Sequence, residues 1–280
     1  MKALKLFLCV FAGSFCHAQM PQCYVSTITG SASVIHNAKT SVLKKGDFIF
    51  KADTIIAKPA AVVTLIDYTN KILTLNKAGK FTYADLQKSL VSKSTGITEA
   101  YFKFIWEDLF KPEAREAISP RNIGGATGGA SRNACDLMVS PLNSSKFSDD
   151  TLFFNWHTAA NTKLYKFTLV DKSKNDIINI LTKDTTVAIL KKDLLQAETT
   201  AYYWKVSAGS NNCAVADSYF TITSVPEKDK EVTAILNAVS NDGDAFIYNL
   251  KVSDILAQKG WHKQAFDYYI KAKQTLFAAK

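Results

Sequence analysis

The sequence has few of the residues and motifs on which most enzymes depend. Its 280 residues include only four histidines and five cysteines. It contains no HExxH or CxxC spacing of a metal site and no GxSxG turn of a serine hydrolase. Because the major catalytic classes are missing together, the sequence favours a non-enzymatic protein that needs no cofactor and no metal.

The histidines outside the N-terminal segment each stand alone. They are His36, His157 and His262. We expect His157 at the end of a strand and His262 on the surface of the last helix. A histidine that acts as a metal ligand or a general base needs a partner at a suitable spacing, and none of these three has one in the sequence.

Neighbouring acids are the other candidates for chemistry. Asp149 and Asp150 are adjacent, and Glu113 and Glu116 lie one helical turn apart. In linkers and on helix faces such acids are usually solvated charge, and two acids form a glycosidase only when a cleft holds them on either side of a sugar. A cell-wall or polysaccharide enzyme with an unfamiliar site is therefore kept as an alternative.

The N-terminus has the pattern of a secretory signal peptide. Lys2 and Lys5 are followed by an apolar run from Leu6 to Phe15, which is too short to span a bilayer. Small residues before the expected cut predict cleavage after Ala18, so that residues 1–18 are removed and the protein is periplasmic or extracellular. A short membrane anchor and a lipid-modified cysteine are less favoured, because Phe15 precedes Cys16 where a small residue would be needed.

No later stretch reaches the roughly 20 apolar residues of a transmembrane helix. The formal net charge of +9 is spread over short pairs such as Lys44-Lys45 and Lys191-Lys192, and no stripe of basic and aromatic residues accompanies it. We therefore expect no nucleic-acid partner and at most a weak attraction to anionic surfaces.

Three cysteines would remain after cleavage: Cys23, Cys135 and Cys213. In an oxidising compartment an odd number allows one disulfide and one free thiol. Cys135 and Cys213 lie at the two ends of one predicted β domain, so we take them as the candidate pair. A catalytic role for either would need a positioned histidine, which the sequence does not indicate.

Residues 19–85 alternate short apolar, β-branched runs with turn residues, which predicts a small barrel or sandwich. Within this region three short motifs follow one another: LKKGD at 43–47, ADTI at 52–55 and AVVTLID at 61–67. In this order they resemble the β domain of FecR-like proteins. The resemblance implies a small β domain used in envelope signalling or surface scaffolding. FecR regulators proper have a cytoplasmic segment and a transmembrane helix ahead of it, whereas this chain has a predicted cleavable signal.

Residues 86–118 change to helical spacing and predict a helical connector of two helices. Residues 119–135 contain Gly124, Gly125, Gly128 and Gly129 with scarcely an apolar residue, which predicts an exposed linker. A phosphate-binding loop is the alternative reading of these glycines, but it would follow a strand, open a helix and, in the Walker case, end in Lys-Ser/Thr.

Residues 136–226 contain about seven short runs separated by turn residues, the pattern of a β-sandwich. FNW at 154–156, LL at 194–195 and YYWKV at 202–206 resemble fibronectin type III and related immunoglobulin-like domains. In that fold a tryptophan on an early strand packs beneath the sheet and a leucine precedes the Y-x-W-x-V strand. The resemblance implies a spacer or recognition module.

Residues 227–280 return to helical spacing, with two amphipathic segments joined at Gly260. Their packing positions resemble those of a single tetratricopeptide-like hairpin; the residues at these positions are Val252, Leu256, Gly260, Ala265, Tyr269 and Ala272. A plain helical hairpin is an equal alternative. Such a unit would pack on the sandwich or cap the surface of a partner.

The whole chain is thus predicted to be a multi-domain, mainly β protein with helical segments. The leading functional hypothesis is an exported envelope protein that binds or spaces other proteins, with another envelope protein or a cell-surface glycan as partner. An envelope sensor related to FecR-like proteins, and a polysaccharide-binding or cell-wall-acting protein, are the alternatives.

Overall fold

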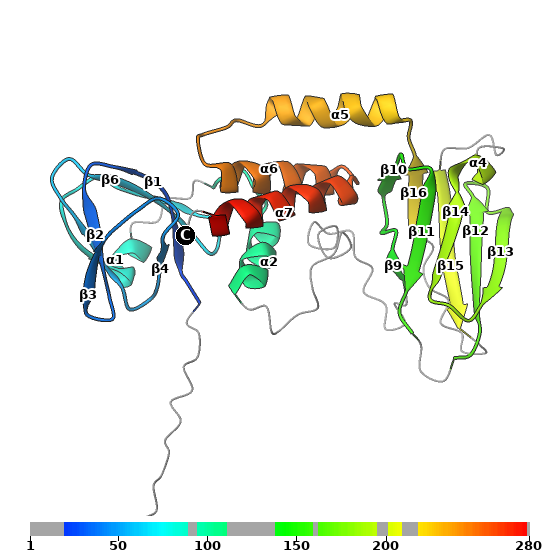
Figure 1. Cartoon of the computed structure of the whole chain (residues 1–280), viewed down its shortest axis with the longest axis horizontal. Helices are drawn as coiled ribbons and strands as arrows, with labels where there is room; N and C mark the ends of the chain where they lie inside the picture. Colours follow the sequence, from blue (N-terminus) through cyan, green and yellow to red (C-terminus); the bar gives the residue numbers. More distant parts are fainter. Residues whose placement is uncertain are drawn as a thin grey trace, which may run out of the picture.

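The computed structural model describes residues 20–88, 94–110, 138–158, 162–194, 201–208 and 218–278. The predicted signal peptide (1–18), the predicted linker (119–135) and the proposed disulfide between Cys135 and Cys213 lie outside these residues. The prediction of a mainly β protein with helical segments is confirmed. Two β units stand at opposite ends of the molecule, and helices lie between and above them (Figure 1).

The first β unit consists of two four-stranded antiparallel sheets, ordered β4-β1-β6-β7 and β3-β2-β5-β8. Apolar side chains that alternate along the strands fill the space between the sheets, among them Val25, Ile55 and Leu65. The strands are β1 (Cys23–Thr29), β2 (Ala32–His36), β3 (Lys39–Val42), β4 (Phe48–Ile49), β5 (Thr54–Ala57), β6 (Val62–Asp67), β7 (Ile72–Leu75) and β8 (Gly79–Thr82).

The acids of the motifs LKKGD, ADTI and AVVTLID each close a turn of this unit. Asp47 accepts a hydrogen bond from the backbone N–H of Lys44 at 2.7 Å, and Asp53 accepts one from Phe50 at 2.8 Å. Asp67 accepts backbone N–H groups from the turn that joins β6 to β7. Carboxylates in such positions satisfy backbone donors that the turns would otherwise leave open, so the motifs position strands rather than a reactive site.

The second β unit also has two sheets, with strand orders β10-β16-β15-β12-β13 and β14-β11-β9. All pairs are antiparallel except β10 with β16. The strands are β9 (Met138–Ser140), β10 (Ser145–Phe147), β11 (Thr151–Trp156), β12 (Tyr165–Asp171), β13 (Asp176–Thr182), β14 (Thr186–Leu190), β15 (Ala201–Ala208) and β16 (Ser218–Ile222).

Aromatic side chains dominate the core of this second unit. Phe154 packs edge-on against Phe167, Trp204 and Phe220, and Trp156 stacks on Phe167. The short helix α4 (Lys191–Leu194) contributes the buried Leu194. This core contains no residue from the helices outside the unit, so the unit has a core of its own.

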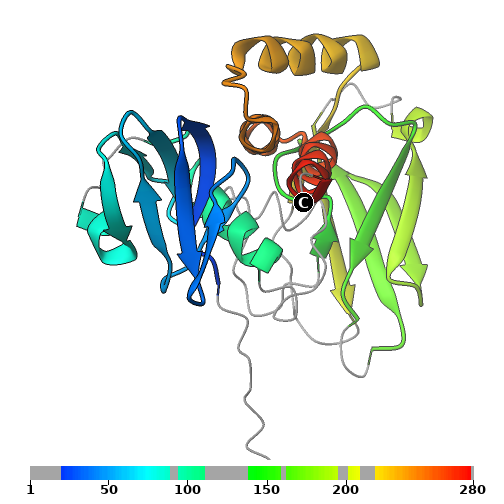
Figure 2. The same ribbon diagram turned by 60° about the vertical axis from the view of Figure 1, so that its left-hand side comes forward.

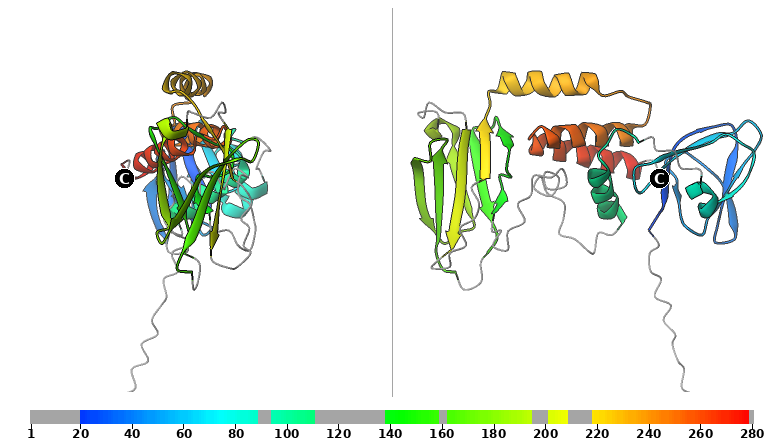
Figure 3. Two further views of the ribbon diagram at one scale, coloured as in Figure 1. Left: turned by 90° about the vertical axis from the view of Figure 1, so that its right-hand side faces the viewer. Right: turned by 180° about the vertical axis from the view of Figure 1, so that it is seen from behind.

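The remaining helices are α1 (Tyr83–Lys88), α2 (Glu99–Phe110), α5 (Val225–Ala238), α6 (Ala245–Gln258) and α7 (His262–Ala278). Ser224 caps α5, and Asp244 caps α6 by accepting the backbone N–H groups of Phe246 and Ile247. Seen from behind, α5 connects β16 with α6 and runs above the antiparallel pair α6 and α7 (Figure 3). None of the helices in the described part of the chain is both long enough and apolar enough to cross a bilayer.

The hairpin of α6 and α7 packs mainly on α2 and the first β unit. One hydrophobic core joins Tyr24 and Ile66 of that unit with Trp106 of α2, Leu250 of α6 and Tyr269 of α7. Figure 2 shows the two helices end-on between the β units. The packing residues of the predicted hairpin are all buried. All of them except Gly260 belong to the core shared with the N-terminal half of the chain, whereas Gly260 contacts the second β unit.

The second β unit meets the helices at the turn between α6 and α7. The backbone N–H of Lys146 donates to the Gly260 carbonyl at 2.9 Å. A Cβ on Gly260 would lie 2.2 Å from the carbonyl oxygen of Ser144, and the residue has φ +85°. Glycine is therefore required there both for the backbone conformation and for the close approach of the two segments.

Candidate functional site

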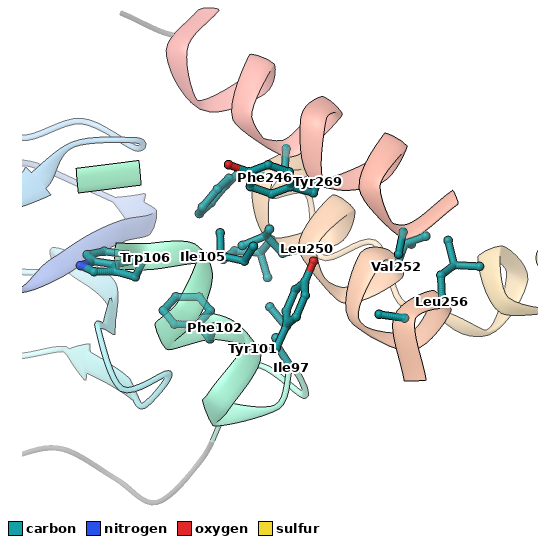
Figure 4. Close-up of a cluster of buried hydrophobic side chains, with 14 of the residues drawn as sticks. Ile97, Tyr101, Phe102, Ile105, Trp106, Phe246, Leu250, Val252, Leu256 and Tyr269 are labelled. Carbon is teal, nitrogen blue, oxygen red and sulfur yellow. The ribbon is translucent and has the colours of Figure 1, made fainter. Parts of the chain in front are cut away.

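Buried apolar side chains of α2, α6 and α7 pack together where these helices meet (Figure 4). A buried polar network also holds α2 against the helical hairpin. Asp254 of α6 accepts the backbone N–H of Thr98 at 2.7 Å and its hydroxyl at 3.1 Å. The hydroxyls of Tyr101 and Ser253 lie 2.5 Å apart, and the Ser253 hydroxyl donates to the Ala265 carbonyl. The network links α2, α6 and α7 with each polar group paired, as a buried polar cluster requires.

Two further contacts extend this polar attachment. Tyr269 of α7 donates its hydroxyl to Asp108 of α2. Asp244, besides capping α6, accepts from Tyr24 at 3.3 Å and from Ser26 at 2.9 Å in β1. Burial raises the pKa of Asp254 and of Tyr101. These side chains are shut off from solvent, so the arrangement stabilises a fixed packing of the helices and offers no open reactive group.

An open apolar groove runs between α5 and α6. Ile235 is the one buried residue of α5. Beside it lies a cavity of about 550 Å³. Its apolar lining comes mostly from small or branched side chains on facing helices: Ala234, Ile235, Ala238, Val239 and Ile255. A space of this size with such a lining is typical of a binding pocket.

Charged residues border the groove, and most of them are already paired. Glu231 makes two hydrogen bonds with Lys146, at 2.8 and 2.9 Å, and Lys251 is paired with Asp242 at 2.9 Å. Burial by itself would raise the pKa of Glu231, but Lys146 and the nearby Trp261 and Lys259 outweigh that effect and lower it. Within the described residues Lys259 lies within salt-bridge distance of no carboxylate, although it acts on Glu231, and these three lysines and two acids together have a formal charge of +1.

A second cavity of about 450 Å³ continues this groove toward the first β unit. Both cavities are lined by Thr95, Ser240 and Lys251. The second has a polar lining, with Thr27 and Thr64 on the β side and Tyr248 on α6. Together the two cavities form one path along α6 that changes from apolar to polar.

None of the three histidines singled out in the sequence lines this groove. His36 Nδ1 lies 2.6 Å from Asp53, an acid that also closes a turn. His157 directly follows β11, as predicted for a strand-end residue. The prediction of a surface position for His262 is wrong: both of its ring nitrogens are shielded from solvent. His262 opens α7, where the second β unit packs on it, and burial lowers its pKa to about 4.

Only part of the predicted pairs of acids and cysteines lies within the described residues. Asp149 is paired with Lys263 at 2.9 Å, while Glu113 and Glu116 lie outside the described residues. Cys23 is a buried free thiol whose pKa is raised to about 12, first by burial and then by Asp67. In the described ranges no three His, Cys, Asp or Glu side chains come together as metal ligands.

No protein-family model matches this chain. No curated protein matches it either.

Sequence reasoning missed the residues that form the groove. Ala234 and Ala238 are four positions apart on α5, so they share a face of that helix. Alanine occurs both in cores and on helix surfaces, so the hydrophobic pattern does not tell which of the two these positions belong to. The two alanines on one face of α5 were the signal that could have indicated an open groove, because small side chains leave space next to a larger residue such as Ile255 on α6.

Proposed function

We propose that this chain is an exported, non-enzymatic protein of the cell envelope that binds a partner protein through the groove between α5 and α6. The observation that carries the proposal is the groove itself. Most residues of α5 are exposed although several of them are apolar, and the helix leaves about 550 Å³ open beside α6. Apolar surface bordered by charge is the usual form of a protein-binding face.

The chemistry of the groove indicates the kind of partner. Ala234, Ala238 and Val239 offer room for an apolar side chain, and Lys259 at the rim favours an acidic neighbour in the partner. An amphipathic segment with an apolar stripe next to Asp or Glu therefore fits best. The predicted signal peptide supports a partner in the periplasm or outside the cell.

The two β units support a role as spacers. The strand order of the second unit agrees with an immunoglobulin-like or fibronectin type III-like sandwich. The Tyr202 hydroxyl donates to the Leu194 carbonyl at 2.9 Å, which is the contact of a tyrosine corner. The turn-closing acids of the first unit favour a FecR-like β domain. In this proposal both units are rigid modules that hold the helical face in place.

Affinity capture from native envelope extract tests the proposal with a pair of variants on α5. Ala238→Glu places a carboxylate in the groove, whereas Asn237→Glu adds the same charge at the adjacent exposed position outside it. We expect the wild-type chain and Asn237→Glu to retain the same partner protein and Ala238→Glu to lose it. Equal retention by both variants, or no partner with the wild type, would overturn the proposal.

A further inference from the structure

A third cavity lies where the second β unit meets the start of α7. It has a volume of about 490 Å³ and is lined by β9, β10 and β11 on one side and by Gly260, His262 and Lys263 on the other. In Figure 1 these strands face the end of the helical hairpin. Clefts between structural units are favoured places for small-ligand sites.

Strand β11 provides the floor of this cavity. Because side chains alternate along a strand, Thr151, Phe153 and Asn155 share the face that points away from the sandwich core. The Phe153 side chain is 56% exposed, which is unusual for a large aromatic residue, whereas its neighbours Leu152 and Phe154 are fully buried. Phe153 therefore offers an uncovered ring inside a cavity.

Polar groups around this ring are open for hydrogen bonds. Within the described residues the Asp150 carboxylate and the hydroxyls of Thr151 and Ser140 have no protein partner. Asn155 uses its Oδ1 to accept from Thr186, which leaves its NH₂ group to donate. The cavity thus presents a carboxylate that accepts, an amide that donates and hydroxyls that do both.

The charges of the cavity restrict the ligand further. Lys146 is paired with Glu231 and Lys263 with Asp149, so the formal charge left unpaired is that of Asp150. Burial keeps His262 neutral at pH 7. An anionic ligand would meet the Asp150 carboxylate, and a hydrocarbon would leave the polar groups unpaired.

We propose that this cavity, with Phe153 as its aromatic floor, is a binding site for an uncharged saccharide unit of a glycan. A sugar ring has an apolar C–H face that packs on an aromatic ring, and each hydroxyl both donates and accepts. It therefore matches the cavity in both respects. The site shares no lining residue with the groove between α5 and α6, although the Lys146–Glu231 ion pair joins their borders, and it does not depend on the protein-binding role proposed above.

Titration of the whole chain with uncharged tetraoses of glucose, N-acetylglucosamine, xylose and mannose, followed by calorimetry, tests this site. We expect at least one to bind the wild type. Phe153→Ala and Asp150→Asn should each weaken that binding tenfold or more. Within the described residues the Phe153 ring is not part of the sandwich core and the Asp150 carboxylate makes no hydrogen bond. Leu181→Ala is the matched control, since Leu181 is 67% exposed on β13 in the other sheet of the same unit.

Three results would overturn the saccharide assignment. One is the absence of binding by every tetraose, and another is binding that Phe153→Ala leaves unchanged. The third is binding of a trilysine peptide that Phe153→Ala and Asp150→Asn abolish while no sugar binds, because that would identify a cationic ligand instead. Circular dichroism of each variant confirms that a loss of binding is not a loss of fold.

Discussion

The two β units are attached to the helices in different ways. The first has its own core between its sheets and, through Tyr24 and Ile66, also shares a second apolar core with α2, α6 and α7. Buried hydrogen bonds, such as those that Asp244 accepts from Tyr24 and Ser26, strengthen this attachment. The second keeps a separate core and meets the helices through charged and backbone contacts around Lys146 and Gly260. The comparison teaches that segments far apart in the chain can form one structural unit: the C-terminal helices α6 and α7 share a hydrophobic core with the N-terminal β unit and not with the second β unit, which precedes them.

The largest effect is expected from a substitution that destabilises one unit and leaves the other unchanged. Trp106→Ala removes a buried ring and its hydrogen bond to the Pro21 carbonyl, so we expect a loss of about 3–5 kcal/mol. Hydrogen exchange should show weaker protection in β1, α2, α6 and α7, with β11 and β12 unchanged. Trp204→Ala, in the core of the second unit, should give the opposite pattern. Equal loss of protection in both units after Trp106→Ala would contradict the comparison.

The second largest effect is expected from low pH, which should weaken the packing of the second unit on α7. The pKa of His262 is lowered to about 4 in the packed structure, against 6.5 when it is free, so the packed form binds the proton less well. Packing against α7 should therefore weaken as the pH falls from about 6.5 to 4, by at most about 3 kcal/mol. Small-angle scattering should show the molecule extend in this range. The change should flatten in His262→Gln, and an identical profile in that variant would exclude His262 as its cause.

The contribution of the contact at the turn between α6 and α7 can be measured by comparing substitutions at two glycines. Gly260 and Gly243 both have positive φ, but an added Cβ meets Ser144 only at Gly260 and nothing within 4 Å at Gly243. Gly260→Ala should cost about 1–3 kcal/mol more than Gly243→Ala in urea unfolding, because the backbone strain is common to both. Equal costs would show that the close approach contributes nothing to the attachment.

The smallest effect is expected at the exposed ion pair. Lys263 and Asp149 lie 2.9 Å apart with side chains 63% and 43% exposed, so solvent screens their attraction. Lys263→Ala should change stability by about 0.5 kcal/mol or less, and raising the salt concentration should remove that difference. A loss above about 1.5 kcal/mol would mean that this contact anchors the second unit.

Local elements could be predicted from the sequence because their causes are local. Turn residues such as Lys45-Gly46-Asp47 and helix caps such as Asp244 act on backbone groups only a few positions away. The sequence analysis accordingly anticipated the β and helical regions and the packing residues of the hairpin. Those signals carry no information on which distant surface a hairpin will cover.

The long-range assembly and the cavities could not be predicted for the same reason. Tyr24 and Asp244 are 220 positions apart, and neither has a neighbour that indicates the other. His262 was assigned to the surface of the last helix, whereas the segment around Asn143 covers it. Phe153 follows an ordinary strand alternation, and only the packing of α7 beside β11 makes it part of a cavity.

The core that the first unit shares with the helices also affects the order in which the chain can fold. Its two halves are separated in the chain by the second β unit, whose own core is complete once β16 has been synthesised. The second unit can therefore complete its core while Tyr24, Ile66 and α2 still expose the apolar surface that α6 and α7 will cover, even though the core between the sheets of the first unit needs only residues 23–86. A chaperone that protects this chain would act on its beginning for as long as its end is still missing.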